Sequence, residues 1–475
     1  MPDEKLKERV EDYVGEVWED VVADIRSLVR IRSVEDLSHA TQKDPWGPAS
    51  HEALRRALSI ASRLGLDAHD CEGYLGYADV TGSSEDYLAT IAHCDVVPEG
   101  LGWTVEPFDV TRKDAYLVGR GVLDDKGPLV LSLYAAHFFA REVERTSRRL
   151  PLTLRAIIGS EEETGMGDVS YYLDHYPQPR FVFTPDADFP LICGERGILQ
   201  GHFSSDPTAG VAGSRIVSVE GGTVPNAICG LASAVVRAEL GELPECGQVG
   251  RSVEGEGLVR LTAKGRGGHA SLPEGTINAI GLLVDYLLDA GLVSDAQRPF
   301  FELEQLLCSS GHDGVALGVQ SANDRFGALS IIGGTIRSQA GRLIQSCDVR
   351  YPDSTSADTL AHILTRRAKE HDASFAVDLV KPPFYADPSS PEVRCLLNTY
   401  DEYVGGVSKP FVIGGGTYAR EFERACAFGP HEPGEDVPAW VGPEHGPDEA
   451  VSEESLRRAL KIYIVSIARL MRLYA

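Results

Sequence analysis

The sequence predicts an α/β protein of two domains, in which a discontinuous domain with a central mixed sheet flanked by helices carries an inserted α+β domain. Three observations support this fold class. The chain has 475 residues, which is more than one typical hydrophobic core accommodates. Apolar runs alternate with helical patterns in the first third, as is typical of a sheet covered by helices. Short alternating runs replace this rhythm after Gly197, and a helical pattern returns near the end of the chain.

The first segment, residues 1–196, is expected to begin with a helix and to continue with alternating strands and helices. Apolar residues recur at helical spacing within 1–35, which predicts an amphipathic helix there. The following elements are, in order, a strand at 87–92, a helix from Gly127, a strand at 152–158, a helix near 168–175 and a strand at 181–183.

The insert, residues 197–380, is expected to combine antiparallel strands with two helices. Its alternating runs predict strands at 200–203, 214–219, 233–240, 257–263 and 343–349, and its helical patterns lie at 276–290 and 357–370. The last segment, residues 381–475, begins in a turn-rich stretch where Pro391 suits a helix start. It ends in a long amphipathic helix at 452–473, which we expect to pack against the domain formed by the first segment.

Charge and cysteine usage exclude several classes of protein. The formal net charge of −26 disfavours nucleic acid as a partner, because phosphates would be repelled. The nine cysteines are scattered singly, which indicates reduced thiols in a reducing compartment. No apolar stretch resembles a signal peptide or could span a bilayer. We therefore expect a cytoplasmic protein without a membrane partner.

Four polar motifs follow strands or loops of the first segment, at the sheet edge where α/β proteins bind ligands. They are His93-Cys94-Asp95, the loop 119–128 with Asp124 and Asp125, Glu161-Glu162-Glu163, and the 184–188 turn with Asp186. Each also has a simpler interpretation, respectively a polar strand end, a helix cap by Asp125, a solvated charge run and a Pro-Asp turn. Carboxylates directly after a buried strand are nevertheless costly to desolvate unless a cation lies beside them. Together the motifs indicate a metal site with a carboxylate beside it that handles protons.

The order and spacing of these motifs resemble the zinc aminopeptidase-like metallopeptidase family of carnosinase, aminoacylase and carboxypeptidase G. The residues within the motifs are most similar to those of the bacterial PepV-type dipeptidases. The resemblance extends over most of the chain through four further motifs, which are 268–273 (GHASLP), 348–352 (DVRYP), 414–420 (GGGTYAR) and 445–449 (HGPDE). It implies that the first and last segments form a catalytic domain and that the insert is a lid for substrate recognition.

The resemblance also implies a role for each motif residue. The ligands of two divalent metal ions would be His93, Asp124, Glu163, Asp186 and His445. Asp124 would bridge the ions, with His93 and Asp186 completing one site and Glu163 and His445 the other. Glu162 would be the general acid/base, and Asp95 would orient His93. The mixed nitrogen and oxygen set suits zinc, with cobalt or manganese as alternatives.

In the insert and the last segment, the resemblance implies residues that bind substrate. His269 would donate to the scissile carbonyl oxygen, and Arg350 would grip the C-terminal carboxylate, assisted by the backbone N–H groups of Gly415 and Gly416. One position departs from the relatives, several of which carry an Asn before the Val-Pro of the insert. Here Asn226 follows that Pro instead, so carbonyl polarisation is expected to rest more on His269 and the metals.

The implied function is dimetal-dependent hydrolysis of dipeptides, or similarly short peptides, that carry a free C-terminal carboxylate. Three carboxylates and a bridging hydroxide would balance the four positive charges of two divalent ions, which favours hydroxide as the nucleophile. The alternative is an N-acyl amino acid deacylase of the same fold, because both reactions use the same metal ligands. A non-catalytic binding protein is disfavoured, since no ligand position is empty. The chain would act as a monomer if the insert covers its own site, and as a homodimer if His269 comes from a partner subunit.

Overall fold

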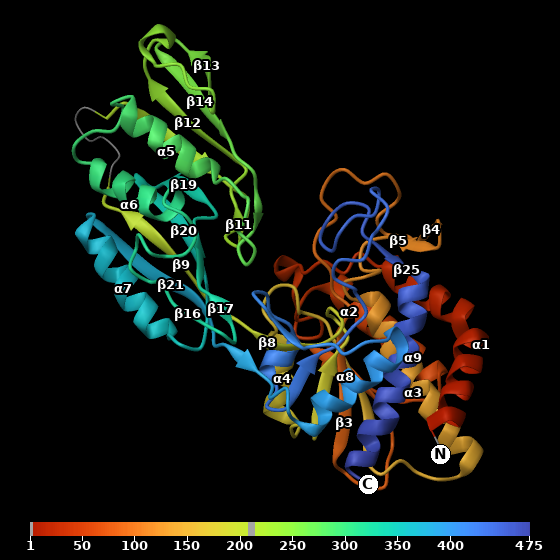
Figure 1. Cartoon of the computed structure of the whole chain (residues 1–475). Coiled ribbons are helices and arrows are strands. Elements are labelled where there is room, and N and C mark those ends of the chain that lie inside the picture. The colour runs from red at the N-terminus through yellow and green to blue at the C-terminus, as the bar shows by residue number, and fades with distance from the viewer. Residues whose placement is uncertain (1–2, 208–213) are drawn as a thin grey trace. The chain divides into compact units, whose positions relative to one another are not determined.

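The computed structural model describes residues 3–207 and 214–475, so residues 1 and 2 of the predicted N-terminal helix region and part of the predicted insert lie outside it. The chain divides into two compact units (Figure 1). Unit 1 comprises Met1–Cys193, Tyr385–Phe411 and Gly416–Ala475, and unit 2 comprises Gly194–Phe384 and Val412–Gly415. We propose that the units correspond to the two predicted domains, although Val412–Gly415 lies within the predicted last segment.

Unit 1 is built on a mixed sheet whose central strands are parallel. The order is β1 (Asp67–Cys71), β2 (Leu75–Val80), β6 (Thr153–Gly159), β3 (Tyr87–His93), β7 (Phe181–Thr184) and β24 (Ala425–Ala427). β3 pairs in parallel with β6 and β7, and β24 joins β7 in parallel, so the last segment of the chain extends the sheet made by the first. The strands predicted at 87–92, 152–158 and 181–183 are confirmed. β8 (Ile192–Glu195), β22 (Phe384–Tyr385) and β23 (Phe411–Ile413) lie where the chain passes between the units.

Long helices cover this sheet, and several of them pack on one another. They are α1 (Asp3–Val29), α2 (Pro48–Arg63), α3 (Lys126–Thr146), α4 (Gly167–His175), α8 (Pro391–Val404) and α9 (Glu453–Leu473). α1, α3 and α9 pack against one another, and α3 also lies against β2, β3 and β6 (Figure 1). Two 3-10 helices, η1 (Leu37–His39) and η3 (Tyr418–Glu421), and a small sheet of β4 (Thr111–Lys113), β5 (Tyr116–Val118) and β25 (Ala450–Ser452) complete the unit.

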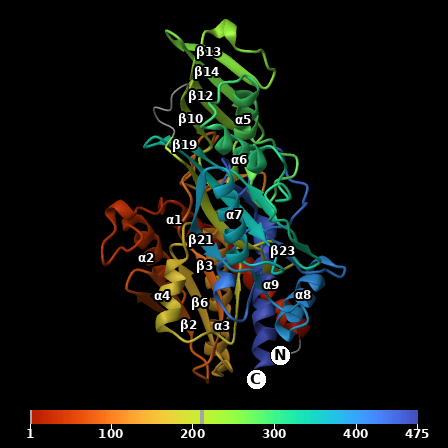
Figure 2. The ribbon, with the colours of Figure 1, turned by 90° about the vertical axis from the view of Figure 1, so that its left-hand side faces the viewer.

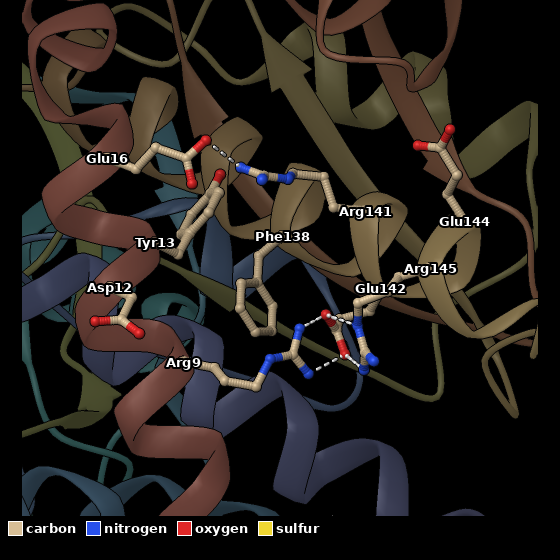
Figure 3. Close-up of a pocket in the computed structure, with 9 residues that line it drawn as sticks. All are labelled: Arg9, Asp12, Tyr13, Glu16, Phe138, Arg141, Glu142, Glu144 and Arg145. Carbon is tan, nitrogen blue, oxygen red and sulfur yellow. Dashed lines mark hydrogen bonds and ion pairs between the residues drawn. The ribbon is translucent and has the colours of Figure 1, made fainter.

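The contact between α1 and α3 explains the apolar spacing of the N-terminal segment. The residues at helical spacing in α1, including Val10, Val14, Val17 and Val21, are buried, which confirms the predicted amphipathic helix. A polar groove borders this contact, where Arg9 pairs with Glu142 and Arg141 with Glu16 (Figure 3). Its charged groups therefore largely neutralise one another across the two helices.

Unit 2 is built on a second sheet, and every pair of strands in it is antiparallel. The order is β13 (Val249–Gly255), β14 (Leu258–Lys264), β12 (Leu231–Arg237), β10 (Ile216–Gly221), β19 (Ile336–Gln339), β20 (Arg342–Tyr351), β9 (Gly197–Ser205) and β21 (Ala373–Lys381), with β18 (Ser330–Ile332) beside β20. Figure 2 shows α5 (Ala279–Asp289), α6 (Arg298–Cys308) and α7 (Ala357–Glu370) one after another along this sheet. Short elements complete the unit, namely β11 (Ala227–Ile228), β15 (Gly268–His269), β16 (Ala322–Asn323), β17 (Gly327–Ala328) and η2 (Leu240–Glu242).

The α+β character predicted for the insert is confirmed, with two corrections. The prediction of two helices missed α6, which lies between them in the chain. The strand predicted over 233–240 ends at Arg237, because Glu239 caps the 3-10 helix η2. Within the described part of the chain the cysteines form no disulfide, and seven of the nine are buried. Among those same residues, every helix is too short or too polar to cross a bilayer.

Candidate metal centre

The candidate site lies at one edge of the sheet of unit 1, where the parallel strands β3, β6 and β7 end. Because carboxyl ends of parallel strands meet at the same edge, the polar residues that follow these strands converge. His93 ends β3, Glu161–Glu163 follow β6, and Asp186 follows β7. The loop before α3 adds Asp124, and the segment before β25 adds His445.

Asp124 lies between the two histidines, with one carboxylate oxygen toward each. His93 Nε2 is 3.0 Å from Asp124 Oδ1 and 3.6 Å from Asp186 Oδ2. His445 Nε2 is 2.7 Å from Asp124 Oδ2 and 3.0 Å from Glu163 Oε2. The structure thus brings all five predicted ligands together, and the Asp124 carboxylate has the position of a bridge between two ions.

The residues present fit a pair of divalent ions. Two donors that bind one zinc tetrahedrally are about 3.3 Å apart, and the separations given above bracket that value. His93 is fully buried, yet its Nε2 makes no hydrogen bond with any residue that the structure describes. Burial lowers the pKa of His445, but the Asp124 and Glu163 carboxylates outweigh it and raise that pKa to about 12. The cluster therefore attracts positive charge, as a cation site should.

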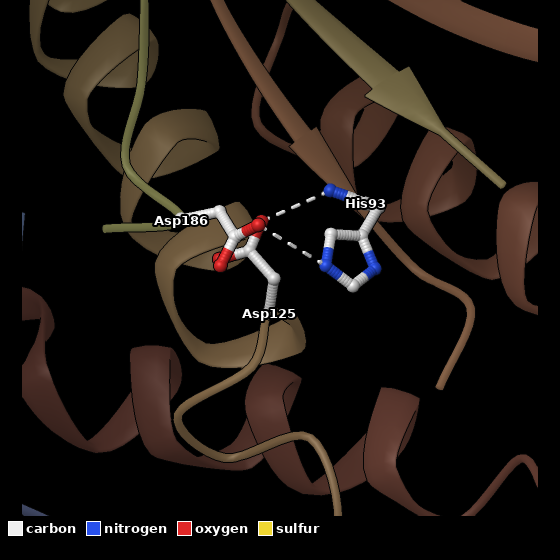
Figure 4. A group of neighbouring side chains, drawn as sticks. All are labelled: His93, Asp125 and Asp186. Carbon is white, nitrogen blue, oxygen red and sulfur yellow. Dashed lines mark hydrogen bonds and ion pairs between the residues drawn. The ribbon is translucent and has the colours of Figure 1, made fainter. Parts of the chain in front are cut away.

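Asp125 does not take the helix-capping role that its position before α3 suggests. It stands at the N-cap, but its side chain makes no capping bond. One carboxylate oxygen, Oδ2, instead accepts the backbone N–H of His93 at 3.0 Å (Figure 4). Oδ1 has no hydrogen-bond partner in the described part of the chain. Ligand atoms of His93, Asp125 and Asp186 lie within 4.8 Å of one another, as do those of His93, Asp124 and Glu163. Asp125 is thus a further candidate ligand, which the motif alone did not distinguish from a cap.

Asp95 links His93 to the loop that carries Glu163. The Nδ1 atom of His93 is 3.1 Å from the backbone oxygen of Asp95 and 3.3 Å from its Oδ1. Both neighbours are acceptors, so Nδ1 donates to Asp95, while Nε2 on the other side of the ring faces the carboxylates of Asp124 and Asp186. Asp95 Oδ2 also accepts the backbone N–H of Glu163 at 3.1 Å. One carboxylate therefore sets the positions of two candidate ligands.

Glu161 supports the loop after β6 from within. Its carboxylate accepts the Thr164 hydroxyl at 2.8 Å and the backbone N–H of Gly167 at 2.5 Å. Asp168 holds the same loop by accepting the backbone N–H of Glu161 at 3.1 Å and the Tyr418 hydroxyl at 2.5 Å. These bonds occupy Glu161 and leave the next two carboxylates for chemistry. Sequence reasoning identified neither Asp168 nor Tyr418.

Glu162 and Glu163 have different surroundings. Glu163 Oε2 contacts His445, and its Oε1 accepts the backbone N–H of Val97 at 3.3 Å. Burial raises the pKa of Glu162 well above its usual value, the positive charge of His93 opposes this, and the carboxylates of Asp186 and Glu163 add to it. Of the two, only Glu163 belongs to a group of convergent ligand atoms.

The predicted substrate residues of the lid lie in unit 2 and have partners there. His269 on β15 pairs with Ala227 of β11, and its Nδ1 accepts the backbone N–H of Ser271 at 3.3 Å. Arg350 is buried, and its Nε and Nη2 donate to Asp348 at 2.6 and 3.0 Å. A third bond joins Arg350 Nη1 to the backbone oxygen of Gly414 at 3.0 Å.

The two glycines predicted to bind the carboxylate fall on either side of a unit boundary, with Gly415 in unit 2 and Gly416 in unit 1. The backbone oxygen of Asn226 accepts the N–H of Ala270, the residue after His269. The main chain of Asn226 thus supports the His269 loop.

Comparisons with known proteins agree over nearly the whole chain. The model of Peptidase family M20/M25/M40 matches residues 89–469. The protein named "Putative dipeptidase SH1171" from Staphylococcus haemolyticus is 30% identical over 480 residues, covering 97% of this chain and 98% of that one. The Beta-Ala-Xaa dipeptidase of Lactobacillus delbrueckii is 29% identical over 473 residues, covering 95% and 96%. Among solved structures, the dipeptidase Dug1p of Saccharomyces cerevisiae has a TM-score of 0.63 at 11% identity, covering 98% of both chains.

Proposed function

The chain belongs to Peptidase family M20/M25/M40 and is a metallopeptidase, and on that premise we propose that it hydrolyses dipeptides or similarly short peptides with a free C-terminal carboxylate. Relatives that match almost end to end carry dipeptidase names, which supports this substrate class. The observation that carries the proposal is the Asp124 carboxylate, placed between His93 and His445 with one oxygen toward each.

We assign the ligands of two divalent ions from these contacts. Asp124 would be shared, His93 and Asp186 would complete one site, and Glu163 and His445 the other. Zinc suits this nitrogen and oxygen set, with cobalt or manganese as alternatives. When bound, the ions would polarise the scissile carbonyl and make a water molecule acidic enough to attack it. The scattered cysteines agree with a reducing, cytoplasmic location.

Glu162 is assigned the proton transfers. It lies near Asp186 and Glu163 without itself belonging to a group of convergent ligand atoms. A carboxylate in that position takes the proton of the attacking water and then gives it to the leaving amine nitrogen. Asp95 keeps His93 in the tautomer that presents Nε2.

The lid residues are assigned to the substrate. Arg350 has five N–H groups, and the three bonds described above leave two for the C-terminal carboxylate of a dipeptide. Gly415 and Gly416 would add backbone N–H groups. Because Nδ1 of His269 accepts a backbone N–H, its Nε2 carries the proton and can donate to the carbonyl oxygen. Sedimentation of the protein distinguishes a monomer, in which His269 would act within one chain, from a homodimer, in which it could come from the partner subunit.

A substrate panel tests the reaction. The metal-loaded protein is incubated with dipeptides, the same dipeptides as C-terminal amides, longer peptides, and N-acetyl amino acids. Rapid release of amino acids from free dipeptides, with little from the amides, is expected because the amides lack the carboxylate that Arg350 binds. Preferential hydrolysis of N-acetyl amino acids would establish the deacylase instead. Rapid cleavage of long peptides would refute the length limit.

Two neighbouring substitutions test the division of roles. Glu162→Gln should lower kcat by about 10²- to 10⁴-fold while two metal ions per chain remain bound. Glu163→Gln should lose metal, because the amide is a weaker ligand than the carboxylate. Glu161→Gln weakens the bonds to Thr164 and Gly167 but removes no ligand, so it should keep the metal and lose less activity than Glu162→Gln. The opposite pattern, with metal lost from Glu162→Gln and kept by Glu163→Gln, would shift the assignment by one residue.

A further inference from the structure

A buried ion pair joins the loop of Asp124 to the segment of His445. Arg120 and Glu449 are both fully buried, and Arg120 Nη1 is 2.5 Å from Glu449 Oε2. The two residues are 329 positions apart in the chain, so this bond connects the first segment of unit 1 to the last. Neither residue figures in the ligand set, and the mechanism above does not use them.

The second carboxylate oxygen of Glu449 holds the backbone of the Asp124 loop. Glu449 Oε1 accepts the N–H groups of Gly121 and Leu123 at 3.0 Å each and that of Asp124 at 3.2 Å. The backbone oxygen of Glu449 accepts a fourth N–H, that of Gly119, at 2.9 Å. Buried backbone N–H groups need partners, and here one residue supplies partners to four of them. The loop conformation therefore depends on where Glu449 lies.

The segment that carries Glu449 is fixed on its other side by Asp448. The Asp448 carboxylate accepts the backbone N–H and the hydroxyl of Thr104 at 2.8 and 2.9 Å. The backbone oxygen of Asp448 accepts the N–H of Gly442 at 2.9 Å. His445 lies between these two fixed points in the chain, so the backbone that carries it is held beside Glu449.

We propose that Glu449 is a positioning residue of the metal centre, which sets the separation of Asp124 and His445 by holding the Asp124 loop. The inference rests on the proposed metal centre. Stability alone explains the pair poorly, because apolar replacements of a buried ion pair are often neutral or stabilising. Its four bonds to the loop of Asp124 instead indicate a role in ligand geometry, because groups that hydrogen-bond around metal ligands usually fix the orientation of those ligands.

Amide hydrogen exchange of the metal-free protein tests the loop contact directly. Glu449→Gln leaves Arg120 facing an amide, and the exchange of the Gly121, Leu123 and Asp124 amides should become at least about tenfold faster, a change of about 1.4 kcal/mol. The matched control is Asp79→Asn, which breaks another ion pair of unit 1, with bonds to Arg155 of 2.7 and 2.8 Å. In that control the three loop amides should exchange within twofold of the wild type. Unchanged exchange in Glu449→Gln would overturn the proposal.

Zinc affinity tests the consequence for the metal centre. In competition with a chromophoric chelator, Glu449→Gln should bind at least one of the two ions about 10- to 100-fold more weakly, while Asp79→Asn stays within twofold of the wild type. Wild-type affinity in Glu449→Gln would overturn the proposal. If the wild type itself binds no metal, the proposed function fails, and the amide exchange still decides the loop contact.

A double variant tests the proposal even if the Glu449→Gln protein does not fold. Arg120→Met combined with Glu449→Gln removes both charges, so neither partner is left as an unpaired ion at this position. It keeps an amide oxygen near the loop, but that oxygen is a weaker acceptor than a carboxylate. Zinc binding about tenfold weaker than that of the wild type is expected. Equal binding would show that the ion pair does not position the ligands.

Discussion

Replacing Glu304 by methionine should stabilise unit 2, and the gain should grow as the pH rises. Glu304 lies on α6 and is fully buried. Among the described residues its Oε1 has no hydrogen-bond partner, and its Oε2 is contacted only by the thiol of Cys308, whose sulfur is 3.9 Å away. Burial alone raises the pKa of Glu304 well above its usual value. Methionine is unbranched, of similar length and needs no partner.

The size of the effect follows from these contacts. A buried polar group without partners costs about 1–3 kcal/mol, and the methionine variant should recover that amount. The unfolded chain ionises near pH 4.5, whereas the folded state keeps the proton until its raised pKa is reached. Between these values the folded state binds more protons, so wild-type stability falls by about 1.4 kcal/mol per pH unit relative to the variant. Below about pH 4.5 this pH-dependent part is absent.

Calorimetry of the full chain between pH 5 and pH 8 measures this difference, with a chelator present so that metal does not contribute. For a unit of this size, each 1 kcal/mol raises Tm by about 2–4 °C. Glu302→Met, an exposed neighbour on α6, is the matched control and should change the free energy of unfolding by less than about 0.5 kcal/mol at every pH. A Glu304→Met variant that is less stable than the wild type, or whose gain does not vary with pH, would refute the reasoning.

Three further predictions concern unit 1, the metal ions and the lid. Gly159→Ala places a Cβ 2.0 Å from the Tyr418 hydroxyl oxygen, so it should lower the free energy of unfolding by about 1–3 kcal/mol and remove much of the activity. In the control, Gly15→Ala in α1, the Cβ meets no atom within 4 Å, and the free energy of unfolding should rise by about 0.5–1 kcal/mol. Equal stability of the two variants in denaturant unfolding would contradict this packing. Zinc at 100 times its Kd should raise the free energy of unfolding by about 2.7 kcal/mol, and an equal Tm with zinc and with chelator would refute folded-state binding. Arg350→Lys should raise KM for dipeptides about tenfold or more, because lysine lacks the planar guanidinium that can bind Asp348 and a substrate carboxylate together. Initial rates that show a fall in kcat alone would argue against carboxylate binding by Arg350.

The sequence predicted those elements whose causes are local. The final helix is one example, because Ser452 caps it and Glu453 and Glu454 occupy its first turn, as the pattern indicated. The helix at 357–370 is another, with bounds identical to those of α7. α2 and α6 were not predicted, although Pro48 and Pro299 in their first turns were available signals. Capping residues and prolines in the first turn therefore indicate helix starts, including those of α2 and α6.

The motifs also predicted which side chains would converge at the sheet edge, since parallel strands bring their carboxyl ends together. What they could not predict depends on partners far away in the chain. Glu449 belongs to a turn-rich acidic stretch, and only the folded chain brings it to the N–H groups of the Asp124 loop. Asp125 resembles a cap until the neighbouring strand supplies the N–H of His93. The roles assigned to the site residues stay predictions.

The contribution of the last segment to the sheet edge bears on when the site can form during synthesis. His445 is made 352 positions after His93, which at about 5–20 residues per second takes roughly 18–70 s. From the synthesis of Asp186 onward, which is 259 positions before His445, the nascent chain carries Asp124, Glu163 and Asp186 without the second histidine, and without Glu449 to hold the loop. The complete ligand set exists only once the segment that carries His445 has been made. Binding of both proposed ions by that set would therefore follow synthesis of the last segment of unit 1.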